Sequence, residues 1–334
     1  MLLPTTYTAA MLALAATALF WGVWANTQRA AGKWRFELYS FDFAIGALAT
    51  ALLLAVTLGN AGSSSSFTFE DSLTVASKRS MAVAMGGGAI FGLGNTMILA
   101  GVVLAGMSTA LPVAASVALL TAVAAHAMGG GPANPALVYG GAGAALAAVI
   151  FGAFAQRAAA AGSPVIKGMH RGWKGFILSC IGGLAAGASL PIVESSRAGD
   201  LGIGAFGAVV FLTAGLALIT PLVNVYFLNL PVQGEAGSPR AYLKGTAKQH
   251  VLGLAGGALW AAGATALFAA AGGMYAGAPA FLSLEALGYG GAVAGALCGL
   301  IVWSEQAGAP KARTMLLGTL ALLAAGATLT FLGA

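Results

Sequence analysis

The sequence predicts an all-α integral membrane protein with ten transmembrane helices, and three observations support this. Ten apolar stretches, each about as long as a bilayer requires, follow one another from Tyr7 to Phe331. Charged residues make up only 7% of the chain. A β-barrel would show short segments in which apolar and polar side chains alternate, and the sequence has no such segments. Each crossing is therefore expected to be helical, because backbone N–H and C=O groups in lipid must pair within their own segment.

Each crossing needs roughly 20 apolar residues, since the hydrocarbon core is about 30 Å thick and a helix rises about 1.5 Å per residue. The stretches that meet this requirement lie at 7–27, 36–58, 80–104, 108–127, 133–156, 173–195, 201–230, 250–271, 278–304 and 314–333. No positive charge precedes the first stretch and its apolar run continues to Ala25, so we expect a permanent helix rather than a cleaved signal peptide. The 50 glycines allow the helices to pack closely, which is how helices associate in lipid.

The basic residues are concentrated in one set of loops. Twelve of the 15 Lys and Arg residues lie in the loops between spans 1 and 2, 5 and 6, 7 and 8, and 9 and 10. The other three are Lys78, Arg79 and Arg197. The positive-inside rule therefore predicts that the first set of loops is cytoplasmic and that both termini are external. This excess is the usual topology signal, so it implies neither a nucleic-acid partner nor a specific lipid.

Two segments half the chain apart share a sequence pattern. Residues 87–96, GGAIFGLGNT, align without gaps with residues 256–265, GGALWAAGAT. The two segments are five helices apart, an odd number, so the copies must enter the membrane from opposite sides. This predicts a 5+5 inverted repeat with a binding site near the midplane. The first repeat is expected at 1–160, a cytoplasmic linker at 161–172 and the second repeat at 173–334. The alternative is a general close-packing stripe in a Gly/Ala-rich chain.

A motif at the end of the seventh span is hard to obtain from composition alone. Residues 222–234 read LVNVYFLNLPVQG, and 241–243 read AYL. Further motifs are Gly22-x-Trp24-Ala25, Asp42 between two phenylalanines, Gly92-Leu93-Gly94-Asn95, Glu305 and Arg313-Thr314. With these motifs the chain resembles the ureide permease family of the drug/metabolite transporter superfamily. The resemblance implies a five-plus-five inverted repeat and the import of flat, neutral heterocycles such as allantoin or uracil, commonly with protons. It implies the class of solute and not the compound.

Aromatic rings at the midplane are the first candidates for binding such a solute. Phe91 lies about 11 residues into the third span and Trp260 about 10 into the eighth, so both are some 15 Å deep. Their rings are expected to face each other and to sandwich a planar ligand. The alternative is that they are ordinary core or lipid-facing aromatics. Trp24 and Tyr289 complete the aromatic candidates.

Neutral hydrogen-bonding side chains at similar depth are the second group of candidates. They are Asn95, Thr96, Asn224 and Thr265. An amide-rich solute needs such donors and acceptors, because a buried polar group without a partner costs about 1–3 kcal/mol. The asparagines are favoured over the threonines, since threonine hydroxyls often bond to carbonyls of their own helix.

Three carboxylates inside or near the spans are candidates for ion coupling. Asp42 is the first choice, followed by Glu194 and Glu285, because acidic side chains in lipid are costly and usually functional. Protonation of one carboxylate would remove a buried charge and so ease reorientation of the carrier. The alternatives are an interfacial carboxylate or a pair with a basic or amide group. The coupling ion is expected to be a proton, with sodium as the alternative.

Together these features predict a secondary transporter of the inner membrane that moves a small polar solute by alternating access. A sugar or drug/metabolite carrier of the same superfamily is the closest rival, and a channel is less favoured. An enzyme is not expected, because no nucleophile with a base and no cluster of metal ligands is visible. We expect no cofactor, no nucleic-acid partner, contact with the lipid bilayer, and a monomer or homodimer. The direction of transport stays open.

Overall fold

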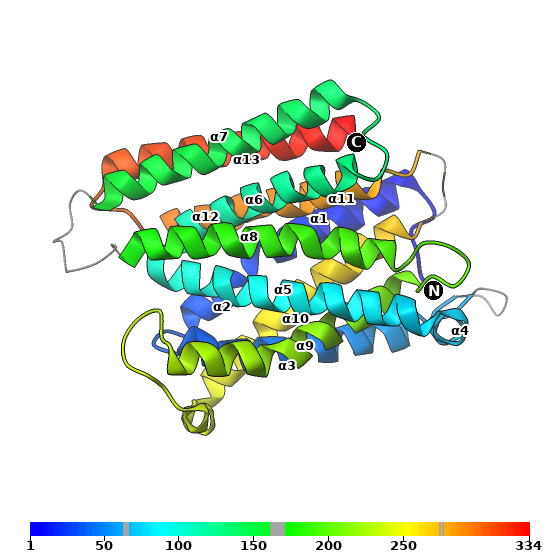
Figure 1. The fold of residues 1–334 in the computed structure, drawn as a ribbon, viewed down its shortest axis with the longest axis horizontal. Coiled ribbons are helices and arrows are strands. Elements are labelled where there is room, and N and C mark those ends of the chain that lie inside the picture. Colours follow the sequence, from blue (N-terminus) through cyan, green and yellow to red (C-terminus); the bar gives the residue numbers. More distant parts are fainter. Residues whose placement is uncertain (63–66, 161–170, 274, 276) are drawn as a thin grey trace.

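The computed structural model describes residues 1–62, 67–160, 171–273, 275 and 277–334, and its regular elements in these ranges are all helical (Figure 1). The helices are α1 (Tyr7–Val23), α2 (Ala25–Ala30), α3 (Phe36–Thr57), α4 (Phe69–Val75), α5 (Lys78–Ala105), α6 (Met107–Ala127), α7 (Pro135–Ala160), α8 (Arg171–Ser195), α9 (Ala205–Asn229), the 3₁₀ helix η1 (Pro239–Lys244), α10 (Ala247–Ala271), α11 (Phe281–Gly290), α12 (Ala292–Ile301) and α13 (Pro310–Gly333).

Ten of these helices or helix pairs are long and apolar enough to cross a membrane. The sequence prediction of a multi-pass, all-α membrane protein is therefore confirmed at this level. Large apolar side chains such as Leu218 and Leu222, each 71% exposed, point outward as lipid contact requires. The expected linker at 161–172 lies outside the described residues except for Arg171 and Gly172, which already belong to α8.

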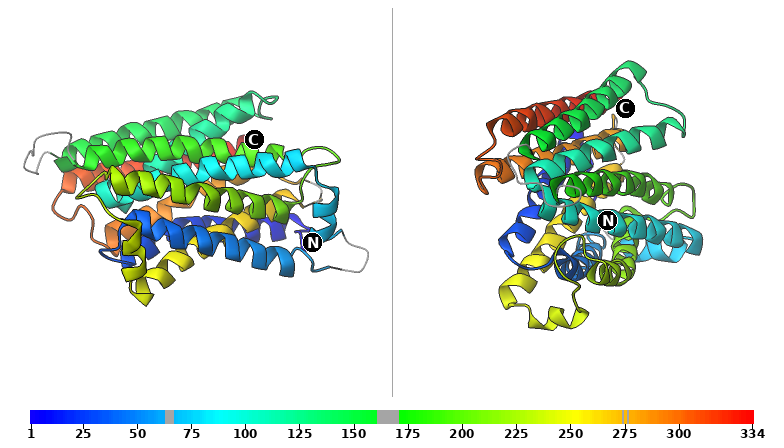
Figure 2. Two further views of the ribbon diagram at one scale, coloured as in Figure 1. Left: turned by 60° about the horizontal axis from the view of Figure 1, so that its bottom comes forward. Right: turned by 60° about the vertical axis from the view of Figure 1, so that its left-hand side comes forward.

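The helices pack into one elongated bundle with two flanks. One flank is the pair α7 and α13, and the other is formed by α3, α9 and α10, with α5, α6, α8 and α11 between them (Figures 1 and 2). Figure 1 places both termini at the end of the bundle that carries α4, and η1 at the opposite end. Because the two termini lie at the same end of the bundle, the chain must cross the bundle an even number of times, in agreement with ten spans.

Side chains at several helix starts supply the hydrogen bonds that the helix itself lacks. Thr246 and Gln249 form a reciprocal capping box at the start of α10, and Thr68 and Asp71 form another at α4. Such caps satisfy N–H groups that have no partner in the first turn. The side-chain and backbone hydrogen bonds from Thr68 also lower the pKa of Asp71.

Two of the ten spans are broken near the middle of the bundle. The first span is interrupted at Trp24, between α1 and α2, and the ninth at Gly291, between α11 and α12. A Cβ added to Gly22 would come within 2.6 Å of the Gly291 carbonyl oxygen. The two breaks therefore lie close together. Discontinuous helices that meet at depth are a common way to line a binding site in transporters.

Glycine brings α3 and α10 into direct backbone contact. A Cβ added to Gly46 would overlap the backbone of Leu254, and one added to Gly257 would overlap the backbone of Phe43. Backbone atoms cannot move aside as a flexible side chain can. The two helices therefore cross at a spacing that only glycine at both positions permits.

A second crossing, between α5 and α9, is built in the same way. A Cβ added to Gly88 would overlap the backbone of Leu212, and one added to Gly215 would overlap the backbone of Met85. Both crossings lie at mid-helix, where they fix the positions of α5 and α10. These are the two helices that carry Phe91 and Trp260.

Replacing a crossing glycine should destabilise the bundle. We expect Gly88→Ala to lower the unfolding temperature of the purified protein in detergent, because overpacking typically costs about 1–3 kcal/mol. Gly86→Ala is the matched control, since it lies on the same helix and an added Cβ there meets nothing within 4 Å. Equal melting temperatures for the two variants would contradict the crossing described here.

Candidate functional site

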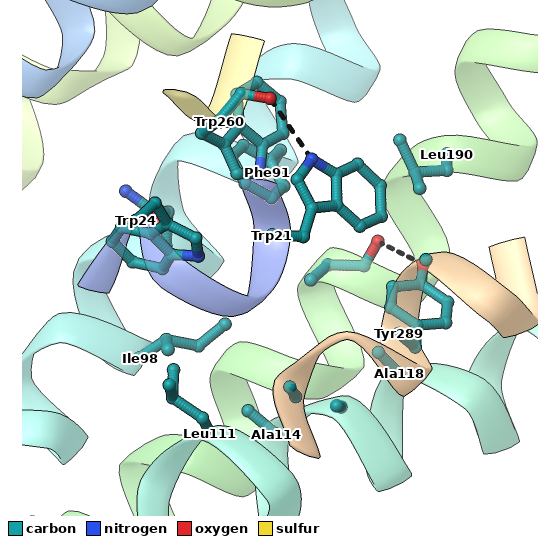
Figure 3. Close-up of a pocket in the computed structure, with 15 residues that line it drawn as sticks. Trp21, Trp24, Phe91, Ile98, Leu111, Ala114, Ala118, Leu190, Trp260 and Tyr289 are labelled. Atoms are coloured by element: carbon teal, nitrogen blue, oxygen red, sulfur yellow. Dashed lines mark hydrogen bonds between the residues drawn. The ribbon is translucent and has the colours of Figure 1, made fainter. Parts of the chain in front are cut away.

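A cavity of about 80 Å³ lies in the middle of the bundle, between α1, α5, α6, α8, α10 and α11 (Figure 3). Its walls are mainly aromatic rings and alanines. Five of the sequence candidates line it, namely Trp24, Phe91, Asn95, Trp260 and Tyr289. Each comes from the face of its helix that is buried in the bundle, so the cavity is the natural centre of the candidate site.

The aromatic rings form a continuous row along one wall. The Phe91 and Trp260 ring centroids are 4.1 Å apart with an interplanar angle of 23°. Trp21 lies parallel to Trp260 at 6.1 Å and adjoins Tyr289 at 6.1 Å. The Trp21 indole N–H donates to the Trp260 carbonyl oxygen at 3.1 Å, which holds α1 against α10 (Figure 3).

In this structure the Phe91 and Trp260 rings face each other and stack directly, and the cavity lies beside the pair. The sandwiching of a ligand between the two rings stays a prediction, which requires that the rings separate. Trp21 is the member of the row that sequence reasoning missed. It is three residues before Trp24, a spacing that puts both side chains on neighbouring parts of one helical face.

The polar side chains of the cavity are few. Asn95 is 2% exposed, and its side-chain oxygen has no hydrogen-bond partner among the described residues. The Tyr289 hydroxyl donates to the Ala186 carbonyl oxygen at 3.4 Å. An unpaired buried amide oxygen carries a free-energy cost, which a ligand N–H or a water molecule would relieve.

Three other polar candidates do not line the cavity. Thr96 and Thr265 donate to the carbonyl oxygens four residues earlier in their own helices, as threonine commonly does. Asn224 is fully buried in α9, and neither of its side-chain polar atoms has a partner among the residues that the structure describes. We have no physical account of this unpaired amide.

A second, larger hollow of about 670 Å³ opens at the end of the bundle where the C-terminal Ala334 lies. Glu194 and His126 line it, and Glu194 forms an ion pair with Arg197 at 2.6 Å. The hollow thus lies at the end of the bundle opposite η1 and has charged side chains in its wall.

Glu285 lies between the hollow and the cavity. Its side chain is fully buried, and neither carboxylate oxygen has a hydrogen-bond partner in the described part of the chain. The nearest basic group is His126, whose Nε2 lies 3.7 Å from a carboxylate oxygen. Tyr289 follows Glu285 by four residues on α11, so the two share one helical face. The sequence alone favours an exposed interfacial position for His126 over a role as a proton relay, since nothing in the chain signals that the end of α6 meets α11.

Asp42 lies toward the η1 end of the bundle and does not line the cavity. Its carboxylate oxygens have hydrogen-bonding partners. It is 2% exposed. The Tyr242 hydroxyl donates to it at 2.5 Å, and His250 Nδ1 lies 3.0 Å from both of its oxygens. A Cβ at Gly253 would contact Asp42, so a glycine makes room for the carboxylate. Tyr242 belongs to the 241–243 motif, which was the one sequence signal for this cluster.

The phenol of Tyr242 should ionise at a higher pH than an ordinary tyrosine. Burial raises the pKa of Tyr242 to about 12, and the hydrogen bond and negative charge of Asp42 act in the same direction. An ordinary tyrosine ionises near about pH 10. Since the folded pKa is the higher one, the contribution of Tyr242 to stability is complete below about pH 10 and is lost as the pH rises through about 12.

Ultraviolet titration checks this prediction. The wild type and Tyr242→Phe should show the same phenolate absorbance until the pH approaches about 12. The variant Asp42→Asn should shift the Tyr242 ionisation downward, because it removes the negative charge. A difference between wild type and Tyr242→Phe that develops near about pH 10 would contradict the contact with Asp42.

The fold is similar to that of a solved structure described only as the crystal structure of a protein, with a TM-score of 0.56, 18% sequence identity and coverage of 98% of both chains. At this identity the likeness concerns the fold alone. No curated protein matches the chain. The ureide permease family model matches residues 39–165, which include Asp42, Phe91 and Asn95. Over this segment, the resemblance to the ureide permease family that the sequence motifs indicated is confirmed.

Proposed function

We propose that this chain is a secondary transporter that carries a small, planar, neutral and polar solute, a ureide or nucleobase-like heterocycle, across the inner membrane. The observation that carries the proposal is the central cavity, where a row of aromatic rings adjoins the unpaired Asn95. No charged side chain is among the described residues that line it. The match to a permease family model supports transport rather than enzymatic chemistry.

The walls of the cavity favour a flat, uncharged ring. Aromatic faces stack with planar molecules, which is worth about 0.5–1.5 kcal/mol beyond the area buried. The Asn95 oxygen would accept a hydrogen bond from a ring N–H. A carboxylate or phosphate solute would meet no cation there, and burying an unpaired charge is costly. The present volume of about 80 Å³ suits a few water molecules, so the solute enters as the Phe91–Trp260 stack separates.

We further propose that the bundle is a 5+5 inverted repeat, with repeats at 1–160 and 173–334. The two glycine crossings support this. Each crossing has one glycine in the first half of the chain and one in the second half. Adding 169 to the number of the first-half glycine of either crossing gives the second-half glycine of the other crossing, because 46 becomes 215 and 88 becomes 257. The backbones that these glycines touch obey the same relation, since 43 becomes 212 and 85 becomes 254. The shift equals the offset of the sequence match between 87–96 and 256–265.

In this proposal both termini are external and the basic loops face the cytoplasm. The hollow near Ala334 is then the external mouth of the carrier, and the end that carries η1 is cytoplasmic. The rocking of one repeat against the other would expose the cavity to each side in turn. A monomer contains the whole cavity, and a homodimer would add no residue to it.

We assign ion coupling to Glu285, with protons as the coupling ion, in place of the first choice, Asp42. Asp42 has two hydrogen-bonding partners, so its carboxylate oxygens do not lie without contacts in the bundle. Glu285 accepts no hydrogen bond within the distance limit among the described residues, and the groups that act on it are the His126 ring, the Tyr289 hydroxyl and the Glu194 carboxylate, none of which is a permanent cation. An uncompensated carboxylate is expensive in this environment. A proton that arrives through the hollow past His126 would neutralise Glu285 and so ease reorientation of the loaded carrier. Glu194, already paired with Arg197, is better suited to the entrance.

Uptake into proteoliposomes tests the substrate class. We expect saturable counterflow of radiolabelled uracil or allantoin, and none of glucose or a lipophilic cation. Trp260→Ala should raise KM about tenfold, because the loss of about 1.4 kcal/mol of ring contact corresponds to that factor. Trp173→Ala is the control, since Trp173 lies at the start of α8, outside the cavity. Glucose uptake would favour the rival sugar carrier, and an unchanged KM in Trp260→Ala would reject the cavity as the binding site.

The coupling role has its own test. Glu285→Gln should retain counterflow but lose accumulation driven by an imposed pH gradient, since the side chain can no longer take up a proton. Glu70→Gln, on the exposed helix α4, should accumulate solute like the wild type. Gradient-driven accumulation that survives in Glu285→Gln would contradict the assignment, as would accumulation that follows a sodium gradient alone.

A further inference from the structure

The carboxylate of Glu305 caps the start of α6. It accepts hydrogen bonds from the backbone N–H groups of Met107 at 3.1 Å and Ser108 at 2.8 Å. These groups have no partner within the helix, and the helix dipole favours an anion at this end. The Arg29 guanidinium lies 3.6 Å from the same carboxylate, whose side chain is only 7% exposed.

The backbone on both sides of Glu305 is strained. Ser304 has φ of 50° and Gln306 has φ of 61°, a left-handed conformation that side chains other than glycine rarely adopt. Strain of this kind persists only where the surrounding contacts hold it in place. Breaking those contacts would release it.

Two glycines make room for the carboxylate. Gly106 has φ of 88°, and a Cβ there would come within 2.8 Å of a Glu305 carboxylate oxygen. A Cβ on Gly299, in α12, would come within 2.9 Å of the same atom. The site is therefore shaped for the Glu305 side chain from both α6 and α12.

Neighbouring contacts join α2, in the first span, to the residues that follow α12, in the ninth span. The Trp303 indole N–H donates to the Asn26 side-chain oxygen at 2.9 Å, and the Arg29 guanidinium lies 5.9 Å from the Trp303 ring centroid. Asn26 and Arg29 belong to α2, whereas Trp303 and Glu305 follow α12. In the proposed repeat these contacts connect one half of the carrier to the other.

These contacts lie at the end of α6 that is remote from the open hollow. Glu305 binds the first residues of α6, whereas His126 near the last residues of α6 lines the hollow. Leu111, one turn inside the start of α6, lines the cavity. The Glu305 contacts therefore lie at the η1 end of α6, about one helical turn beyond the residue of that helix that lines the cavity.

We propose that Glu305, with Arg29, Trp303 and the N-terminus of α6, is the gate that keeps this end of the carrier closed, and that its release is a step of the transport cycle. The inference rests on the proposed transport function and adds to it the residue that controls access. Two properties suit a gate better than a permanent cap. The strained backbone at Ser304 and Gln306 lowers the cost of opening. Arg29, 40% exposed, gives water a route to solvate the separated charges.

Cysteine accessibility tests the gate without any solute. In a background with Cys180 and Cys298 replaced by alanine, Leu111→Cys reports access from the Glu305 end, and Leu282→Cys reports access from the hollow, which Leu282 lines. The probe is a membrane-impermeant maleimide applied to the purified protein in detergent. We expect Glu305→Gln to speed labelling at position 111 by about tenfold and to slow it at position 282. Glu235→Gln, an exposed acidic residue at the same end, should change neither rate.

Two results would overturn the gate. One is an unchanged labelling rate at position 111 in a monodisperse Glu305→Gln protein. The other is a rise by the same factor at both positions, which would mean a generally loosened bundle. If Glu305→Gln does not purify as a monodisperse protein, Arg29→Met becomes the test, with about a threefold rise expected at position 111 alone. An unchanged rate there also rejects the gate. Since labelling needs no transport, this failure is distinct from failure of the uptake experiments.

Discussion

Backbone-to-backbone contact at two glycine crossings is the constraint on which the rest of the structure depends. Lipid offers helices no hydrophobic reason to associate, so close approach must supply the stabilisation. Gly46 and Gly257 join α3 to α10, while Gly88 and Gly215 join α5 to α9. These crossings fix the positions of α5 and α10. They thereby bring the Phe91 ring into contact with the Trp260 ring, and the two rings form one wall of the cavity.

Three carboxylates of the bundle, Asp42, Glu305 and Glu285, have different partners, and these differences indicate different roles. Asp42 receives two side-chain partners, which anchor η1 and α10 to α3. Glu305 receives two backbone N–H groups and a guanidinium. Glu285 has a half-buried histidine as its nearest basic group, with the Tyr289 hydroxyl and the Glu194 carboxylate also close to it. A fully compensated charge stabilises one arrangement, whereas an uncompensated one makes the arrangement depend on protonation. This contrast separates structural contacts from the candidate for coupling.

Much of the fold was predictable because lipid imposes length and apolarity on each span, and those are properties of local sequence. Phe91 and Trp260 were found from their depth alone. Their direct stacking was not predictable, because ring orientation depends on how far α5 and α10 approach each other. Trp21 was missed although it adjoins them. The His250 partner of Asp42 comes from a segment 208 residues away, and no local pattern reveals such a pairing.

The alanines of the cavity have a consequence for how such a chain can diversify. Ala114, Ala118 and Ala186 line the space on α6 and α8. A larger or more polar side chain at one of them would reshape the chamber while leaving the crossings of α3, α5, α9 and α10 intact. New selectivity can therefore arise by single exchanges at these positions, with the scaffold inherited unchanged.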